Sequence, residues 1–128
     1  MSQHEIQFVI PIAPVTKKNH SRIVHLRNGA HALIPSKPYK VYADSVGPFL
    51  RPLGIDYPVN IKATFYMQTR RIVDLPNLHA ALHDVLKDFG VIADDDSRIV
   101  VATDGSRVRY DKERPRTEVV IERVAVDN

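Results

Sequence analysis

One apolar helix, with strand-forming segments on either side of it, most constrains how this chain can fold. Pro76 fits the first turn of this helix, because that turn needs no backbone donor, and Gly90 supplies a C-terminal stop. The apolar residues between them recur at helical spacing: Leu78, Leu82, Val85, Leu86 and Phe89. Strands before and after one such helix favour an α+β domain.

The strand-forming segments are short and separated by turn signals. Residues 59–67 alternate apolar and polar side chains, which is typical of a half-buried strand. We expect residues 107–110 to pair with the strand at 99–103 across the turn Asp104–Gly105. The other strands that the sequence predicts in the body are residues 5–10 and 117–124.

The segment between the first strand and residue 58 predicts a hairpin and a second helix. Asn28–Gly29 separates two short apolar runs, 22–26 and 31–34, and is a strong hairpin signal. A helix is expected from about Pro38 to Leu50, capped by Ser36 and weakened at its end by Gly47 and Pro48. The prediction is one compact α+β domain over residues 1–128, with two main helices and a small mixed or antiparallel sheet.

Composition excludes several classes of protein. The 128 residues are 44% hydrophobic and 26% charged, which is an ordinary globular balance. The absence of cysteine excludes disulfides, thiolate zinc sites, iron–sulfur clusters and a cysteine nucleophile. It also fits a reducing compartment, and the N-terminal residues lack the basic region of a signal peptide, so we expect a cytoplasmic protein. No apolar stretch is long enough to span a membrane.

Aspartates stand at both ends of the predicted central helix. Asp74 precedes it, and Asp94, Asp95 and Asp96 follow it. A helix of this length separates its ends by roughly 20 Å, so the acids meet only if the chain after Gly90 doubles back. If they meet, their oxygens suit Mg²⁺ or Mn²⁺. A run of three aspartates is also typical of a solvated turn.

Basic residues could accompany these acids in a nuclease, since cations contact the phosphate backbone while carboxylates hold a metal ion. Lys17, Lys18, Arg70 and Arg71 are the candidates for DNA contact. Ordinary surface charge is the alternative for any one cluster. Further basic residues lie near the end of the chain: Arg107, Arg109, Lys112, Arg114 and Arg116.

His79 and His83 are four residues apart and could face the same way on the helix. A zinc site is one interpretation, but no glutamate lies between them and no third ligand is evident. A place on a helix face or at a dimer surface is the preferred interpretation.

The run VDLPNLHAALHDVLKDFGVIADDDSRIVV resembles the central motif of the RusA family of Holliday junction resolvases, small endodeoxyribonucleases common in prophages. The tail RYDKERPRTEVVIE and the early basic VTKKNHSRI are similar to the family's end and to its early loop. The matching motif residues are Asp74, Leu75, Asn77, Leu78, Asp84, Leu86, Gly90 and Asp94 to Asp96.

The chain departs from the family pattern at two positions. Pro76 stands where the family has a second aspartate, and Ala80 where it has a lysine. The resemblance implies about three aspartates around Mg²⁺, and Asp74 is the first of them. The key downstream aspartate is Asp95 if positions are counted forward from Gly90, and Asp96 if they are counted back from the following strand. Asp94 could support either one. Asp96 could replace the missing ligand, and His79 or Lys87 the missing cation.

The resemblance implies a homodimer that nicks a four-way DNA junction symmetrically in recombination and repair, with Mg²⁺ or Mn²⁺ as the cofactor. An alternative is a catalytically weakened branched-DNA-binding protein of the same fold, eroded at Pro76 and Ala80. A third class is a small protein-interaction domain without a role on DNA.

Overall fold

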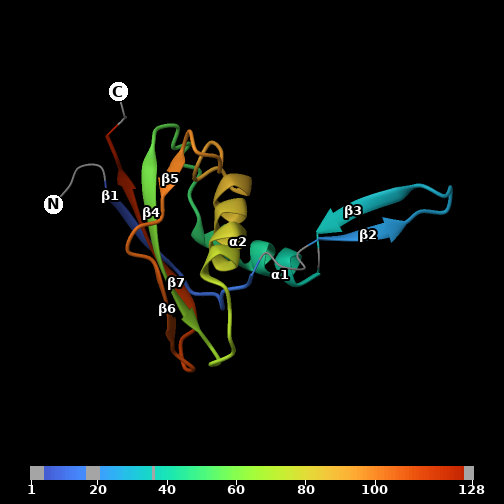
Figure 1. Ribbon diagram of the computed structural model, residues 1–128, viewed down its shortest axis with the longest axis horizontal. Helices are drawn as coiled ribbons and strands as arrows, with labels where there is room; N and C mark the ends of the chain where they lie inside the picture. Colours follow the sequence, from blue (N-terminus) through green and yellow to red (C-terminus); the bar gives the residue numbers. More distant parts are fainter. Residues whose placement is uncertain (1–4, 17–20, 36, 126–128) are drawn as a thin grey trace.

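A mixed sheet forms the centre of the molecule in the computed structural model, which describes residues 5–16, 21–35 and 37–125. Within these residues the strand order is β1–β7–β4, and both β5 and β6 pair with the outer edge of β4 (Figure 1). β1 and β4 are each antiparallel to β7, whereas β5 and β6 are parallel to β4. The strands are β1 (Glu5–Ile10), β4 (Val59–Met67), β5 (Val100–Ala102), β6 (Arg107–Tyr110) and β7 (Arg116–Arg123).

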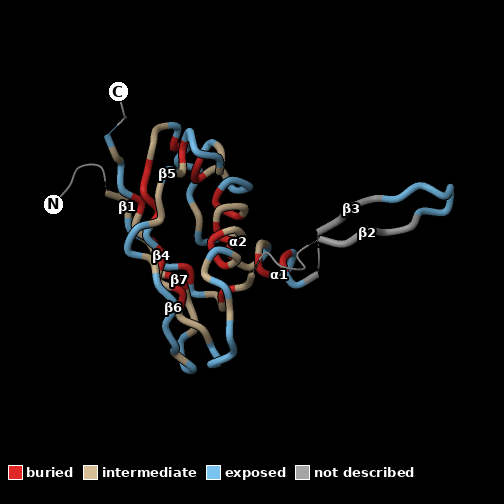
Figure 2. Tube along the Cα trace, viewed as in Figure 1, coloured by how far each residue is buried: buried red, intermediate tan, exposed pale blue. Residues whose placement is uncertain are grey.

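The alternation predicted for residues 59–67 decides which face of the sheet is buried. Val59, Ile61, Ala63 and Phe65 of β4 are all buried, because they point toward the helix that covers this face. Figure 2 shows the buried positions gathered between the sheet and α2. The same face of β7 contributes buried residues at Thr117, Val119 and Ile121.

The central helix, α2 (Leu75–Asp88), lies where the sequence predicts it. Its apolar stripe is fully buried: Leu78, Leu82, Val85 and Leu86 have no exposed surface. Gly90 adopts the left-handed conformation, with φ of 75°, and the amide of Val91 then donates to the carbonyl of Leu86. The helix therefore ends by the local signal that the sequence carries.

The predicted pairing of residues 107–110 with 99–103 is wrong. β5 pairs with the beginning of β4, and β6 pairs with its end, so the chain keeps its direction through the turn at Asp104–Gly105. Two side chains hold this turn against β4. The amide of Asn60 bonds both the N–H and the C=O of Asp104, and the hydroxyl of Ser106 accepts from the amide of Ala63.

The second helix is shorter than predicted. α1 (Lys37–Val46) is followed by a 3₁₀ turn, η1 (Gly47–Phe49), rather than continuing to Leu50. Pro48 has no N–H for a further α-helical bond, which explains the change. Ser36, the predicted cap, lies outside the described residues.

The predicted hairpin is present as β2 (Ser21–His25) and β3 (His31–Pro35). Its turn is built as the Asn–Gly signal requires, because Gly29 has φ of 84° and the side chain of Asn28 accepts from the amide of Ala30. Figure 1 shows this two-stranded ribbon projecting away from the sheet and α2. The α+β prediction, with two main helices and a mixed sheet, is confirmed, and none of the described helices could cross a membrane.

Candidate metal and nucleic-acid site

The sheet topology brings three segment ends together at one end of the molecule. β1 and β4 run in the same direction with β7 between them, so their carboxyl ends lie at the same edge as the N-terminus of α2. A polar, open cleft of about 550 Å³ lies there. Its lining residues are Pro14, Thr16, Met67, Thr69, Arg71, Ile72, Val73, Asp74 and Asn77.

Asp74 occupies the N-cap position of α2, yet its carboxylate does not cap the helix. Its backbone carbonyl accepts from the amides of Asn77 and Leu78, while Pro76 has no N–H to offer. The side-chain amide of Asn77 donates to one carboxylate oxygen of Asp74 at 3.3 Å. The carboxylate is therefore exposed in the cleft, and among the described residues it is held by the neutral side chain of Asn77.

Two arginines, Arg70 and Arg71, lie in the loop between β4 and Asp74. Arg71 lines the cleft, and the guanidinium of Arg70 stacks on the ring of Tyr110 with its central carbon 4.1 Å from the ring centre. Arg116 is engaged internally, since it pairs with Asp111 at 2.8 Å and Glu118 at 3.1 Å. Arg70 and Arg71 are both exposed, and Arg71 shares the cleft with Asp74.

Lys17 and Lys18 lie outside the described residues. Thr16, the residue directly before them, lines the cleft. Their assignment to DNA contact stays a prediction.

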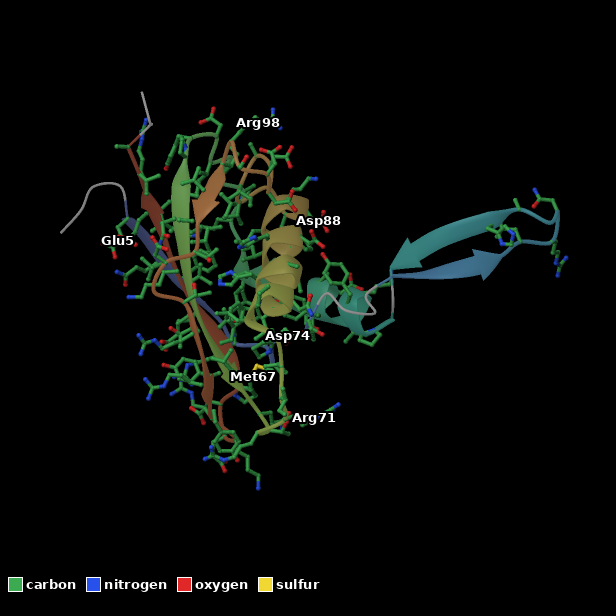
Figure 3. All side chains as sticks on the ribbon, viewed as in Figure 1. Glu5, Met67, Arg71, Asp74, Asp88 and Arg98 are labelled. Atoms are coloured by element: carbon green, nitrogen blue, oxygen red, sulfur yellow. The ribbon has the colours of Figure 1, made fainter. Side chains whose placement is uncertain are left out.

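Asp94, Asp95 and Asp96 lie beyond the opposite end of α2. Figure 3 shows Asp74 and Arg71 at one end of the helix, and Asp88 and Arg98 toward the other. The chain turns back toward the cleft only after these aspartates, because the amide of Val59 at the start of β4 donates to the carbonyl of Ile99 and β5 begins there. The 14 residues of α2 thus keep the two sets of acids roughly 20 Å apart within one chain.

Two of these three aspartates are engaged in ion pairs. Arg98 pairs with Asp96 at 2.6 Å and with Asp94 at 3.2 Å, and Lys87 lies 3.5 Å from Asp94. Hydrogen bonds from the side chain and the amide of Arg98 lower the pKa of Asp96 to about 2. The pKa of Asp94 is also lowered, mainly by the hydrogen bond from the backbone amide of Asp95 and to a smaller extent by the positive charge of Lys87. In the described part of the chain, the carboxylate of Asp95 makes no ion pair.

The predicted three-carboxylate cluster is therefore not assembled in one chain, and no group of three or more potential ligands forms among the described residues. The cleft itself offers hard oxygen donors: the carboxylate of Asp74, the amide oxygen of Asn77 and the hydroxyls of Thr16 and Thr69. Mg²⁺ commonly binds through one or two carboxylates and keeps several waters, so these donors fit it.

His79 and His83 do face one another, with Nδ1 of His79 3.2 Å from Nε2 of His83. His79 lies on the buried face of α2: it is only 6% exposed and packs edge-on against Phe65. Burial lowers the pKa of His79, which disfavours the charged form of this ring. Lys87 is charged and exposed, but it lies with Asp94 at the far end of α2.

Sequence reasoning missed the cleft residues Thr16 and Thr69 and the stacking partner Tyr110. Thr16 and Tyr110 come from distant segments that only the sheet order brings to this end of the molecule, whereas Thr69 lies in the loop directly before Asp74. No local pattern carries that information.

The family model for Endodeoxyribonuclease RusA matches residues 11–122, nearly the whole chain. The protein belongs to the RusA endodeoxyribonuclease family. Members of this family are nucleases that act on Holliday junctions and are generally dependent on a divalent metal. A comparison with curated proteins gave no match.

Proposed function

We propose that this RusA-family protein is a magnesium-dependent endodeoxyribonuclease that acts as a homodimer and resolves four-way DNA junctions by symmetric nicking. The observation that carries the proposal is the position of Asp74. Its carboxylate is exposed in an open polar cleft, beside Arg71 and at the N-terminus of α2, in a chain of this nuclease family.

The cleft residues divide the chemistry between them. Asp74 would hold Mg²⁺, and Asn77 would fix the orientation of its carboxylate through the 3.3 Å hydrogen bond. Bound Mg²⁺ would supply charge stabilisation at the scissile phosphate and would acidify a water molecule. Arg70 and Arg71 would bind phosphates on either side of the cut, and the stacked ring of Tyr110 would keep Arg70 in place.

A site that also uses a downstream aspartate would take it from the second chain of the dimer, because α2 separates the acids of one chain. Asp95 is the best candidate for this role. Its carboxylate is not held by Arg98 or Lys87, as those of Asp94 and Asp96 are. Asp96, and Asp94 in support, would need to leave Arg98 before they could bind a metal.

Mixing two inactive variants tests the shared site. A dimer of one Asp74→Asn chain and one Asp95→Asn chain would keep one intact shared site and lose the other. Random exchange of subunits makes about half of the dimers mixed, so about a quarter of the wild-type sites should be active. A mixture that stays as inactive as each variant alone would refute the shared site.

The proposed activity is tested on a synthetic four-way junction with MgCl₂, MnCl₂ or EDTA. We expect paired nicks on opposing strands with either metal and none with EDTA, and a linear duplex of the same sequence should stay uncut. Junction binding is measured in parallel by gel shift in the presence of Ca²⁺, so that binding and cutting are read separately.

A junction-binding protein without cleavage is the second candidate. The observation that favours it is the pair of departures at Pro76 and Ala80, together with the absence of a three-ligand cluster in the described part of one chain. Such a protein would shift the junction in the gel and leave it intact at every metal concentration.

A further inference from the structure

The basic charge of this chain is concentrated in its N-terminal third. Residues 6–43 contain six lysines and arginines and no aspartate or glutamate. The whole chain has 18 basic and 15 acidic residues, so the other residues have 12 basic and 15 acidic side chains. A segment of charge +6 is therefore joined to a remainder of charge −3, although the net charge of +3 is unremarkable.

The centre of this basic segment is the β2–β3 hairpin, which projects from the body (Figure 1). Its turn residues, including Leu26 and Arg27, are exposed, and Leu26 alone leaves 46% of its surface open. A two-stranded ribbon without a third strand or a covering helix is marginally stable in water. Such a ribbon gains stability when it lies against another surface.

We propose that the β2–β3 hairpin is a DNA-gripping arm that lies along a duplex branch of the junction and binds its phosphates. This inference rests on the proposed function and adds a second contact surface to it. DNA carries one negative charge per about 1.7 Å of helix axis, so its phosphates attract an arm that has two arginines and no acidic residue. A two-stranded antiparallel ribbon also fits the width of the major groove.

The arm starts close enough to the cleft to hold the same DNA. Thr16 lines the cleft and Ser21 begins β2, and five residues of chain span at most about 18 Å. Each five-residue strand extends about 17 Å, which equals about five base pairs of B-form duplex. A branch seated at Asp74 would therefore pass within reach of the arm.

A second copy of the chain is a weaker partner for the arm. Two arms paired by a two-fold axis would bring like charges together. Among the described acidic side chains of the body, four already form ion pairs within their own chain: Asp94 and Asp96 pair with Arg98, and Asp111 and Glu118 pair with Arg116. The phosphates of DNA have no such internal partner.

The test measures junction affinity against salt concentration for variants of Arg22 and Arg27, the two lysine or arginine residues in the hairpin. The double change to alanine should lower the slope of log affinity against log salt by about 1.8, at roughly 0.9 per lost phosphate contact. Arg27→Lys should keep the wild-type slope, since it keeps the charge. Arg51→Ala removes one exposed arginine outside the arm and should change nothing.

The outcomes separate this inference from the proposed function. If wild type binds and cuts junctions and the double variant has the same slope, the arm does not grip DNA and only the arm inference fails. If the slope falls as expected but no protein cuts with any metal, the arm stands and the nuclease proposal fails. A double variant that keeps its slope but sediments as a monomer would show that the arm contacts a second copy, which also overturns the inference.

Discussion

We expect the histidine pair on α2, buried His79 and half-buried His83, to make the fold sensitive to mild acid. The pKa of His83 is lowered from its ordinary 6.5 to about 4. Burial is the main cause and the neighbouring His79 is a smaller one, while the negative charge of Asp95 opposes the shift. Burial also lowers the pKa of His79. Nε2 of His79 is buried without a hydrogen-bond partner among the described residues, so a proton placed there would be poorly solvated.

The lowered pKa of His83 determines how the stability of the fold depends on pH. Because the folded pKa lies below the unfolded one, the unfolded chain binds more protons between pH 6.5 and pH 4, and folding loses stability as the pH falls through this window. A shift from 6.5 to about 4 corresponds to about 3 kcal/mol for His83, of which about 2 kcal/mol is lost by pH 5.

Urea unfolding monitored between pH 7.5 and pH 4 measures this loss. His83→Gln removes the titrating ring and keeps a hydrogen-bonding partner for His79, so its stability should fall by much less over the same range. His31→Gln, at the exposed first residue of β3, makes the same substitution outside the core; it is the control and should follow wild type. If His83→Gln loses as much stability as wild type, the histidine pair does not govern the acid response.

Three further predictions concern DNA contact, the departure from the family pattern and the fold. Replacing Lys17 and Lys18 together with alanine should lower the salt slope of junction binding by about 1.8, and an unchanged slope would remove this loop from the interface. Pro76→Asp restores the family's acid two residues after Asp74 and should raise the rate of junction cleavage at limiting Mg²⁺. Stability should change little, since an acid is favourable near a helix N-terminus. An unchanged or lower cleavage rate would mean that another group already fills that ligand position. Asn60→Ala should lower the free energy of unfolding, measured in urea, by about 1–3 kcal/mol, because the backbone N–H and C=O of Asp104 both lose their partner. An unchanged free energy of unfolding would contradict the role of Asn60 in the turn.

The central helix was predictable because its signals are local. Pro76, the apolar repeat and Gly90 all act within a few residues of the positions that they define, and α2 begins and ends with them. The hairpin turn at Asn28–Gly29 was predictable for the same reason.

The pairing of β6 was not predictable, because its determinants lie far apart in the chain. Asp104–Gly105 has the sequence of a hairpin turn, but Asn60 and Ser106 attach this turn to β4, more than 40 residues away. The long edge of β4 then accepts both β5 and β6, which no local pattern indicates.

The candidate site was half predictable. The motif identified Asp74 and Asn77, which do lie together, whereas the downstream aspartates had to cross the length of α2 to join them. Helix geometry sets that distance at roughly 20 Å, so the sequence alone already indicated that one helix keeps Asp74 apart from the downstream aspartates. What the sequence left undecided was the path of the chain after Gly90. The position of Thr16 depends on the sheet order, and Thr69, although it lies in the loop before Asp74, belongs to no motif that would single it out.

The role of Asp74 is tested most directly by comparing Asp74→Asn with Asp56→Asn on a four-way junction with Mg²⁺. Both changes remove one exposed carboxylate, and Asp56 precedes β4 at the edge of the sheet opposite the cleft. The carboxylate of Asp74 makes no capping bond, so Asp74→Asn should fold and bind junctions as wild type does. We predict that Asp74→Asn binds without cutting while Asp56→Asn cuts normally; cleavage by Asp74→Asn at the wild-type rate would contradict the proposed site.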